Sequence, residues 1–334
     1  MHPALQILSV PTAPGHEGIV AEFVRDWLRT IRVPFREDAH GNLIAKLHSP
    51  GAPSSVAFSV HMDHPGFEVL RSDGRHLEAA FLGGVPRAWF RRGVPVEFFD
   101  DRGKVIALAE VVRVMRWDRR QRRIRLRVKS GFTRPGAFGM WKLSPLKLNR
   151  ARTHVVSRVC DDLAGCAAVL AMLAELAGRR AKVRVTALFT RREEIGLEGA
   201  FEVAAEGALP RSTPVISIET SKALASAPQG AGPIARVGDR SSVFDPAVTQ
   251  RLCVIAQALQ KKDGFRSQRK LMDGGTCEAT AYLERGYRAG GLCVALGNYH
   301  NCAPKGRIAA ENIHLDDWHG LVKWMVATAR EFSK

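Results

Sequence analysis

Apolar residues recur along much of the chain with the two periods that helices and buried strands require. Ile19 to Ile31 repeats apolar residues every three to four positions, which predicts an amphipathic helix. Leu163 to Leu176 is apolar nearly all round and predicts a buried helix. The further expected helices are 197–205, 246–260, 277–284 and 315–331, and the expected strands are 42–47, 55–60, 183–189, 214–218 and 292–296. Strands that alternate with helices predict an α/β sheet covered on both faces.

The pattern changes from about Phe67 to Val155, where no long amphipathic helix appears. Short β-like runs alternate there with glycine and charged turns, and Asp101-Arg102-Gly103 is a good hairpin turn. We therefore expect a small inserted β domain, a barrel, over residues 67–155. Residues 1–66 and 156–334 would then form one discontinuous main domain.

Composition places the chain among globular proteins, because 46% of its 334 residues are hydrophobic and 25% are charged. Met1 to Val10 lacks the pattern of a secretory signal, and no apolar run reaches the length of a membrane span. The six cysteines are scattered without CxxC pairs, as in reduced proteins. We expect a cytoplasmic protein without a membrane partner.

The net charge of +17 is unusual, and much of the excess lies in the expected β domain, notably in Arg113 to Lys129. Basic strands with Trp117 and Trp141 nearby could contact phosphates, so nucleic acid is an alternative partner. Apolar residues interleave with these arginines, which favours the simpler interpretation of a solvated strand face.

Two adjacent carboxylates, Glu193 and Glu194, follow the expected strand 183–189. Like charges repel and a half-buried carboxylate loses hydration, so a metal ion or a transferred proton usually compensates. Because neighbouring residues at a strand end point in different directions, one carboxylate can bind a metal while the other faces a substrate. An isolated Glu-Glu pair is more often a solvated turn, so this assignment depends on the rest of the chain.

Further polar groups follow other expected strands, at the sheet edge where α/β proteins place their sites. They are His61 with Asp63, Asp161 with Asp162, Glu219, and His300. Histidines with carboxylates suit Zn²⁺ or a similar divalent ion, and one carboxylate could bridge two ions as in two-metal hydrolases.

The order, spacing and strand-end positions of these groups resemble the dinuclear zinc aminopeptidase and carboxypeptidase clan. The chain is most similar to metallopeptidase family forty-two, the tetrahedral, deblocking and glutamyl aminopeptidases. The resemblance covers nearly the whole chain, including Leu8 to Val24, the insertion after His61-Met62-Asp63-His64-Pro65-Gly66-Phe67, and Gly274-Gly275-Thr276. It implies a mixed central sheet with helices on both faces, an inserted β-barrel, and aminopeptidase activity in the discontinuous domain.

The resemblance also implies a role for each residue. The ligands of two divalent ions, zinc with cobalt or manganese as alternatives, would be His61, Asp161 as the bridge, Glu194, Glu219 and His300. Asp63 would hold the ring of His61, and the Asp161–Asp162 peptide would be cis. Glu193 would be the general base that takes a proton from water and passes it to the leaving amine. The expected substrate contacts are Gly274, Gly275 and Thr276.

Three positions depart from the family pattern. His64-Pro65 replaces Glu-Ile, and we expect His64 in a loop that lines the cleft. The expected Gly-Gly-Thr-Asp-Ala becomes Gly274-Gly275-Thr276-Cys277-Glu278-Ala279, and Glu219 stands where Asp is common. In the wider clan, Glu there accompanies carboxypeptidases and deacylases, so N-acyl amino acids are an alternative to short peptides as substrates.

The resemblance implies a homo-oligomer that is assembled partly through the inserted domain. Glycoside hydrolysis is the least favoured activity, because its two-carboxylate mechanism does not require His61 and His300.

Overall fold

The computed structural model describes residues 1–118 and 121–334, and its largest element is a mixed sheet. Among these residues the sheet has eleven strands, nine of them in the order β1-β2-β12-β3-β13-β16-β19-β11-β10, while β14 pairs with β15 and β16. Its strands are β1 (Phe35–Glu37), β2 (Leu43–His48), β3 (Val56–His61), β10 (Lys147–Leu148), β11 (His154–Ser157), β12 (Arg184–Thr190), β13 (Val215–Lys222), β14 (Ile234–Gly238), β15 (Gln268–Leu271), β16 (Ala289–Gly297) and β19 (Glu311–His314).

The centre of the sheet is parallel, and this arrangement brings several strand ends to one edge. β12, β3, β13 and β16 run parallel to one another. The register places Thr190 beside His61 and Glu219 beside Cys293. Residues that follow these strands therefore converge at the carboxyl edge of the sheet.

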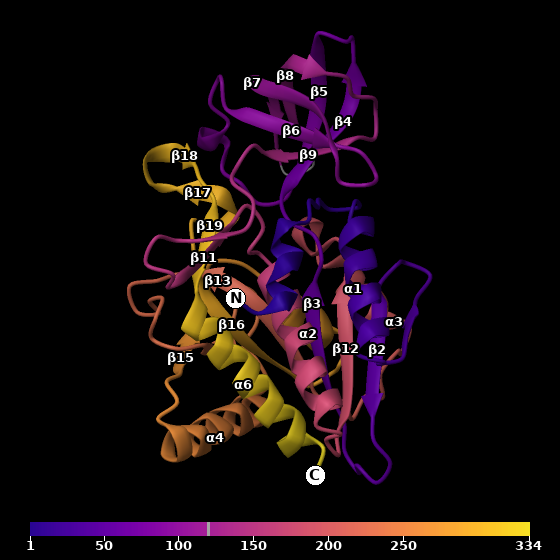
Figure 1. The fold of residues 1–334 in the computed structure, drawn as a ribbon, viewed down its shortest axis with the longest axis vertical. Coiled ribbons are helices and arrows are strands. Elements are labelled where there is room, and N and C mark those ends of the chain that lie inside the picture. The colour runs from indigo at the N-terminus through magenta and orange to yellow at the C-terminus, as the bar shows by residue number, and fades with distance from the viewer. Residues whose placement is uncertain (119–120) are drawn as a thin grey trace.

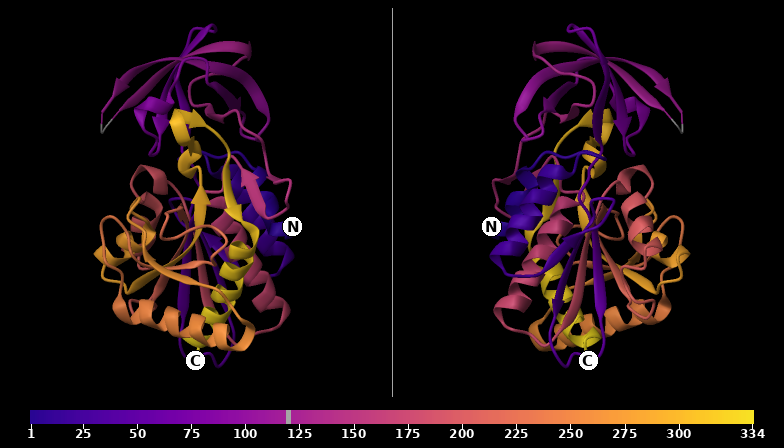
Figure 2. Two further views of the ribbon diagram at one scale, coloured as in Figure 1. Left: turned by 90° about the vertical axis from the view of Figure 1, so that its left-hand side faces the viewer. Right: turned by 90° about the vertical axis from the view of Figure 1, so that its right-hand side faces the viewer.

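Helices cover both faces of the sheet, as Figures 1 and 2 show. They are α1 (Gly18–Thr30), α2 (Leu163–Gly178), α3 (Glu198–Ala205), α4 (Pro246–Asp263), α5 (Glu278–Glu284) and α6 (Leu315–Phe332). The main core packs α1, α2, α4 and α6 against the sheet, and a second core packs α3 and α5 against the opposite face. Helix α2 is buried along most of its length, as its uniformly apolar sequence predicts. In the described residues, no helix is long and apolar enough to cross a membrane.

A closed six-stranded barrel stands above this carboxyl edge (Figure 1). Its strands are β4 (Gly66–Ser72), β5 (His76–Leu82), β6 (Pro95–Phe99), β7 (Val105–Trp117), β8 (Arg122–Gly131) and β9 (Phe138–Trp141). A small hairpin of β17 (Cys302–Ala303) and β18 (Arg307–Ile308) lies beside it. The expected barrel and mixed sheet are both present. β10 and β11 already pair within the main sheet, so the exact domain boundary at residue 155 stays a prediction.

Several polar contacts attach the barrel to the main domain, and three of them lie on one side. Arg158 donates from Nη1 to Glu97 Oε2 of β6 at 3.0 Å, and its guanidinium lies over the ring of Phe99. Trp89 Nε1 donates to the carbonyl oxygen of Ala303, and Arg91 donates to that of Lys305. These bonds fix one side of the barrel over the carboxyl edge.

Candidate active site

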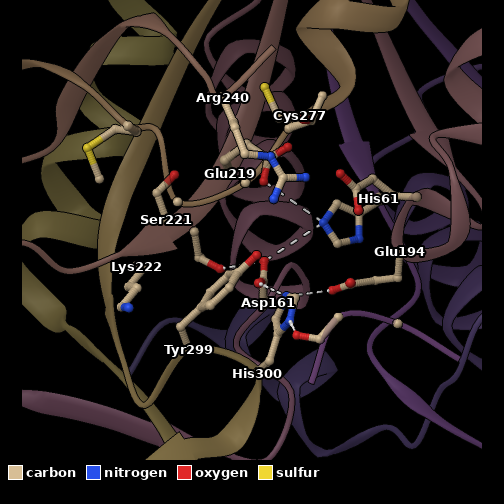
Figure 3. Close-up of a pocket in the computed structure, with 18 of the residues that line it drawn as sticks. His61, Asp161, Glu194, Glu219, Ser221, Lys222, Arg240, Cys277, Tyr299 and His300 are labelled. Carbon is tan, nitrogen blue, oxygen red and sulfur yellow. Dashed lines mark hydrogen bonds and ion pairs between the residues drawn. The ribbon is translucent and has the colours of Figure 1, made fainter. Parts of the chain in front are cut away.

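The side chains that the sequence singles out meet at this edge, beneath the barrel (Figure 3). His61 is the last residue of β3, and Glu219 lies in the second half of β13. Glu193 and Glu194 open a short 3₁₀ helix directly after β12, where Arg192 adopts a left-handed conformation. His300 lies in a 3₁₀ turn beyond β16, and Asp161 directly precedes the N-cap of α2.

Five of these side chains form an unbroken series in which Asp161 is central (Figure 3). His61 Nε2 lies 4.0 Å from Glu219 Oε2 and 3.8 Å from Asp161 Oδ1. The other carboxylate oxygen, Asp161 Oδ2, lies 3.3 Å from His300 Nε2, which is 3.0 Å from Glu194 Oε1. The two oxygens of Asp161 thus face two different histidines, which is the arrangement that a bridging ligand needs.

Both histidines direct Nε2 into the site because the other ring nitrogen is already occupied. His61 Nδ1 donates to the backbone oxygen of Asp63 at 3.2 Å, with Asp63 Oδ1 at 3.5 Å. His300 Nδ1 donates to the carbonyl oxygen of Gly84 at 2.9 Å. A hydrogen bond at Nδ1 fixes the tautomer in which Nε2 carries the free lone pair that a metal binds.

Asp63 also positions the loop that carries the adjacent carboxylates. Its Oδ1 accepts from the backbone N–H of Glu193 at 3.0 Å, and its Oδ2 accepts from that of Glu194 at 3.1 Å. The side chain is fully buried, so these bonds form away from water. One carboxylate therefore orients both the His61 ring and the Glu193–Glu194 turn.

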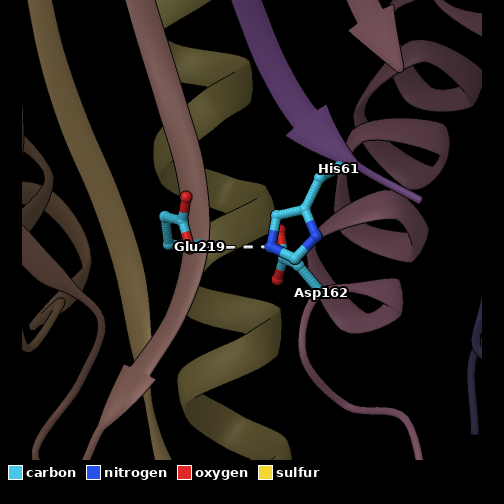
Figure 4. Close-up of side chains that lie close together, drawn as sticks. All are labelled: His61, Asp162 and Glu219. Carbon is cyan, nitrogen blue, oxygen red and sulfur yellow. Dashed lines mark ion pairs between the residues drawn. The ribbon is translucent and has the colours of Figure 1, made fainter. Parts of the chain in front are cut away.

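Asp162 is a further candidate ligand that the sequence argument did not assign. Its peptide bond to Asp161 is cis, as the resemblance implied. A ligand atom of Asp162 groups with those of His61 and Glu219 (Figure 4), while Asp161, Glu194 and His300 form a second group. Asp162 Oδ1 accepts from Gly165 N–H, but the buried Oδ2 has no hydrogen-bond partner. Such an orphaned anionic oxygen is expensive unless a cation lies near it.

The electrostatics of the site indicate a deficit of positive charge. Burial raises the pKa of Glu193 well above its usual range, and burial together with nearby carboxylates raises that of Glu219 to about 8. Burial alone would lower the pKa of His300, but the Glu194 charge and the Asp161 hydrogen bond raise it well above the ordinary value. Burial also acts against the charged form of His61, yet surrounding carboxylates, Glu193 foremost, raise its pKa as well. Carboxylates this crowded favour bound cations.

The donor set therefore fits a pair of divalent ions. It offers imidazole nitrogens and carboxylate oxygens, the ligands that zinc accepts, in two groups of three whose ligand atoms lie within 4.8 Å of one another. The central position of Asp161 and the orphaned oxygen of Asp162 add to this fit.

The structure corrects one expectation: His64 does not line the cleft. Its side chain is fully buried behind the site, where Nδ1 donates to the Asp161 carbonyl oxygen at 2.5 Å and Nε2 contacts Asn301. The turn at Pro65 and Gly66 leads directly into β4 and directs His64 inward. His64 thus supports the backbone of Asp161.

Three supporting residues were missed by sequence reasoning. Buried Glu311 accepts from the Asp161 N–H at 3.0 Å, and buried Glu278 accepts from Ser59 at 2.9 Å and from Thr190. Tyr299 stacks on the His300 ring with the two centroids 3.7 Å apart. Only the departure at Glu278 gave a signal in the sequence. Glu311 acts on a residue 150 positions away, and the stacking of Tyr299 on its neighbour His300 depends on the conformation of the 3₁₀ turn that they share.

A cavity of about 350 Å³ opens over these groups. Its walls include Gly274, Gly275 and Thr276, the expected substrate contacts. Four carboxylates line it, namely Asp161, Glu193, Glu194 and Glu219, and so do four cations, namely Arg122, Lys222, Arg236 and Arg240. Two divalent ions would neutralise the carboxylates and leave the four cations uncompensated.

Comparison with known proteins agrees with this geometry. The family model of the M42 glutamyl aminopeptidases matches residues 41–317, which is most of the chain. The chain belongs to this family. It is therefore a peptidase of the hydrolase class, in a family of metal-dependent aminopeptidases.

Solved structures show the same fold at low sequence identity. The TET1 peptidase of Pyrococcus horikoshii superposes with a TM-score of 0.80 at 22% identity, covering 98% of each chain. An aminopeptidase from the archaeon Desulfurococcus kamchatkensis gives 0.81 at 18% identity, covering 98% of this chain and 93% of that one. An endoglucanase from Thermotoga maritima gives 0.72 at 18% identity, over 99% and 97%. These likenesses establish the α/β fold with its inserted barrel.

Proposed function

We propose that the chain is a dinuclear aminopeptidase that removes N-terminal residues from short peptides in the cytoplasm. The observation that carries this proposal is the series from Glu219 through His61, Asp161 and His300 to Glu194, with both imidazoles presenting Nε2. We assign these five residues as metal ligands, with Asp161 bridging. The nitrogen and oxygen donors suit zinc, and cobalt or manganese are alternatives.

The bound ions would polarise the scissile carbonyl and supply an activated water near neutral pH. Glu193 is the proposed general base, because it lines the cavity beside the ligands without being needed as one. Its carboxylate would accept the proton of the attacking water and then donate it to the leaving amine. Burial raises the pKa of the Glu193 carboxyl above its usual range, which makes its carboxylate a stronger proton acceptor than an exposed one. Asp63 keeps Glu193 in place through the backbone.

The cavity charge suggests the substrate class. Lys222 and Arg240 line the catalytic-domain wall and form no ion pair with any described residue. Arg236 is buried beside them, and its Nε has no hydrogen-bond partner. We propose that Lys222 and Arg240 receive an acidic side chain of the N-terminal residue, in keeping with the family's description as glutamyl aminopeptidases.

The proposal is tested with chelator-treated protein that is reloaded with Zn²⁺, Co²⁺ or Mn²⁺. Anilides of Glu, Ala and Lys should be hydrolysed only after reloading, with Glu fastest, and Arg240→Gln should reduce the Glu-to-Ala rate ratio by about tenfold. Arg240 contributes only its backbone N–H to the local fold, so this variant should remain folded. Absence of anilide hydrolysis with every metal would contradict the aminopeptidase proposal.

The second candidate is a carboxypeptidase or N-acyl amino acid deacylase of the same clan. Glu219 in place of Asp favours it, as do the unpaired cations of the cavity, which would suit a free carboxylate. N-acetyl-amino acids are the discriminating substrates. Their hydrolysis, together with inactivity on anilides, would select this alternative.

We also propose that the chain forms a homo-oligomer. The similar Pyrococcus horikoshii peptidase can assemble into a tetrahedron or a large octahedral shell. Nucleic acid is a weaker proposal, because Trp141 lies in the barrel core and is not available to stack on a base. Light scattering at low and high salt tests the oligomer, and a monomer at both salts would contradict it.

A further inference from the structure

Among the residues that the structure describes, Arg122 is the charged side chain that the inserted barrel contributes to the wall of the catalytic cavity. The other described residues of the barrel region in this wall are Gly83 and Gly84, which follow β5. Arg122 begins β8 and pairs with Trp117, the last residue of β7. The β7–β8 hairpin reaches outward and down from the barrel over one side of the main domain (Figure 2). Arg122 therefore lines the cavity from the barrel side.

The Arg122 side chain is held in place by aromatic packing. Its guanidinium lies 5.6 Å from the centroid of the Trp117 ring. Trp117 packs against Phe90, with ring centroids 4.9 Å apart, and Phe90 belongs to the barrel core. A guanidinium stacked on a fixed ring keeps its donor edge free for a planar anion.

No described acidic residue satisfies this donor edge. Other arginines of the same strand have partners: Arg123 bonds to Glu78, and Arg127 bonds to Glu110. Arg122 forms no ion pair and no side-chain hydrogen bond within residues 1–118 and 121–334, although it is only partly exposed. An arginine that lines a cavity and has no anionic partner of its own is a candidate for binding an anionic group of a ligand.

Arg122 adds a cation from the barrel to the cations that the main domain contributes to the same cavity. Lys222 and Arg240 belong to the main domain, and we have assigned them to the side chain of the N-terminal residue. A cavity of about 350 Å³ is near the lower end of the ~300–1,000 Å³ range of small-ligand pockets, so it encloses a short peptide. If Lys222 and Arg240 bind the side-chain carboxylate of the first residue, the other carboxylate of a dipeptide is its free C-terminus. We expect this C-terminal carboxylate to lie towards Arg122.

We propose that Arg122 is a specificity residue that binds the free C-terminal carboxylate of a short peptide and selects di- and tripeptides. This inference rests on the proposed aminopeptidase function. It assigns the barrel a direct part in substrate choice.

The test compares Ala-Ala with Ala-Ala-amide, which differ only in the terminal carboxylate. The wild-type kcat/KM should be about 10–100-fold higher for the acid, the range expected for a charge-assisted arginine–carboxylate contact. Arg122→Gln should reduce the acid-to-amide ratio to near unity, whereas Arg122→Lys should retain part of it.

Arg125→Gln is the matched control, because it removes the same charge from the same strand at a residue that does not line the cavity. It should keep the wild-type acid-to-amide ratio. If both variants lose the acid-to-amide ratio equally, the preference arises from long-range charge and not from a contact with Arg122. That result would overturn the proposal.

Hydrolysis of Ala-anilide separates the possible failures. If wild type cleaves Ala-anilide but treats the acid and the amide alike, Arg122 is not a carboxylate receptor while the proposed function stands. If Arg122→Gln lowers the Glu-to-Ala anilide ratio and leaves the acid-to-amide ratio unchanged, the C-terminal assignment is wrong. Inactivity on Ala-anilide with every metal would instead reject the proposed function itself. Should Arg122→Gln not fold, the wild-type ratio and Arg122→Lys decide the question.

Discussion

The two groups of candidate ligands are built from different kinds of structure. His61 and Glu219 lie on neighbouring parallel strands of the main sheet, and Asp162 caps a buried helix. Glu194 and His300 lie in 3₁₀ turns beyond their strands. We call the first set, His61, Asp162 and Glu219, the sheet group. The second, Asp161, Glu194 and His300, is the loop group.

The ring of each histidine is also held from a different part of the molecule. Asp63, two residues further along the chain, holds His61. The carbonyl oxygen of Gly84, which follows the barrel strand β5, holds His300. The sheet group is thus fixed by strand register within the main domain, while the loop group depends on the position of the barrel. We expect metal binding at the loop group to respond to barrel contacts and metal binding at the sheet group to be insensitive to them.

Asp161→Asn should have the largest effect, because Asp161 is the link between the groups. An amide cannot provide two anionic oxygens to two ions, so both should bind more weakly. We expect hydrolysis to fall by about 10³-fold or more, beyond the ~10–100-fold cost of losing an outer partner of a ligand. Metal analysis after dialysis should show less than full occupancy. Two ions retained per chain would contradict the bridging role.

Glu193→Gln should abolish the chemistry and leave both groups occupied. The amide is nearly the same size but cannot accept the proton of water, so hydrolysis should fall by about 10²-fold or more. Metal content should equal that of the wild type, since Glu193 is in neither group. Full activity in this variant would show that another residue is the base.

Most of the candidate ligands could be proposed from the sequence, because they lie at the end of a recognisable apolar run or just beyond it. Strand 183–189 pointed to Glu193 and Glu194, and the structure places them directly beyond β12. The family resemblance added the bridging role of Asp161, which the structure supports through the distances to both histidines. Local sequence pattern thus sufficed for residues that lie at strand ends.

The supports of those ligands were not predictable, because they come from distant parts of the chain. Gly84 and His300 are 216 residues apart, and Glu311 lies 150 residues from Asp161. A backbone carbonyl carries no residue signature, so nothing in the sequence distinguishes Gly84. Six of the described strands of the main sheet were not expected there for a related reason, namely β1, β10, β11, β14, β15 and β19. They are short and loop-flanked, so pairing with a neighbouring strand determines them more than their own pattern does.

Asp63→Asn should weaken metal binding at the sheet group more than metal binding at the loop group. The amide keeps the shape but loses the charge beside His61, and it can no longer accept from both backbone N–H groups of the Glu193–Glu194 turn. Loss of such an outer partner typically costs 10–100-fold in metal affinity or activity, and we expect a fall of about that size. Titration with Co²⁺ should show one site weakened more than the other. Equal weakening of both would indicate that Asp63 acts mainly through the turn.

Gly84→Ala is the smallest and most selective perturbation, and it addresses the loop group alone. A Cβ at this position would lie 3.4 Å from the Cε1 and Nδ1 atoms of His300, so the added methyl group presses on the ring without filling the cavity. We expect the affinity for the loop-group ion to fall by about 3–10-fold, below the full loss of an outer partner, while the sheet-group ion is unaffected. Gly18→Ala is the matched control, because nothing lies within 4 Å of the Cβ it would add. The measurement is the same Co²⁺ titration, with unfolding midpoints to confirm that both variants are intact.

Two outcomes of the Gly84→Ala titration would contradict the contrast between the groups. If this variant lowers the affinity for both ions equally, the shared residue Asp161 couples the two groups, and the separate supports of the two histidines matter less. If it weakens neither, the barrel carbonyl does not control His300 and the contrast between the two groups fails.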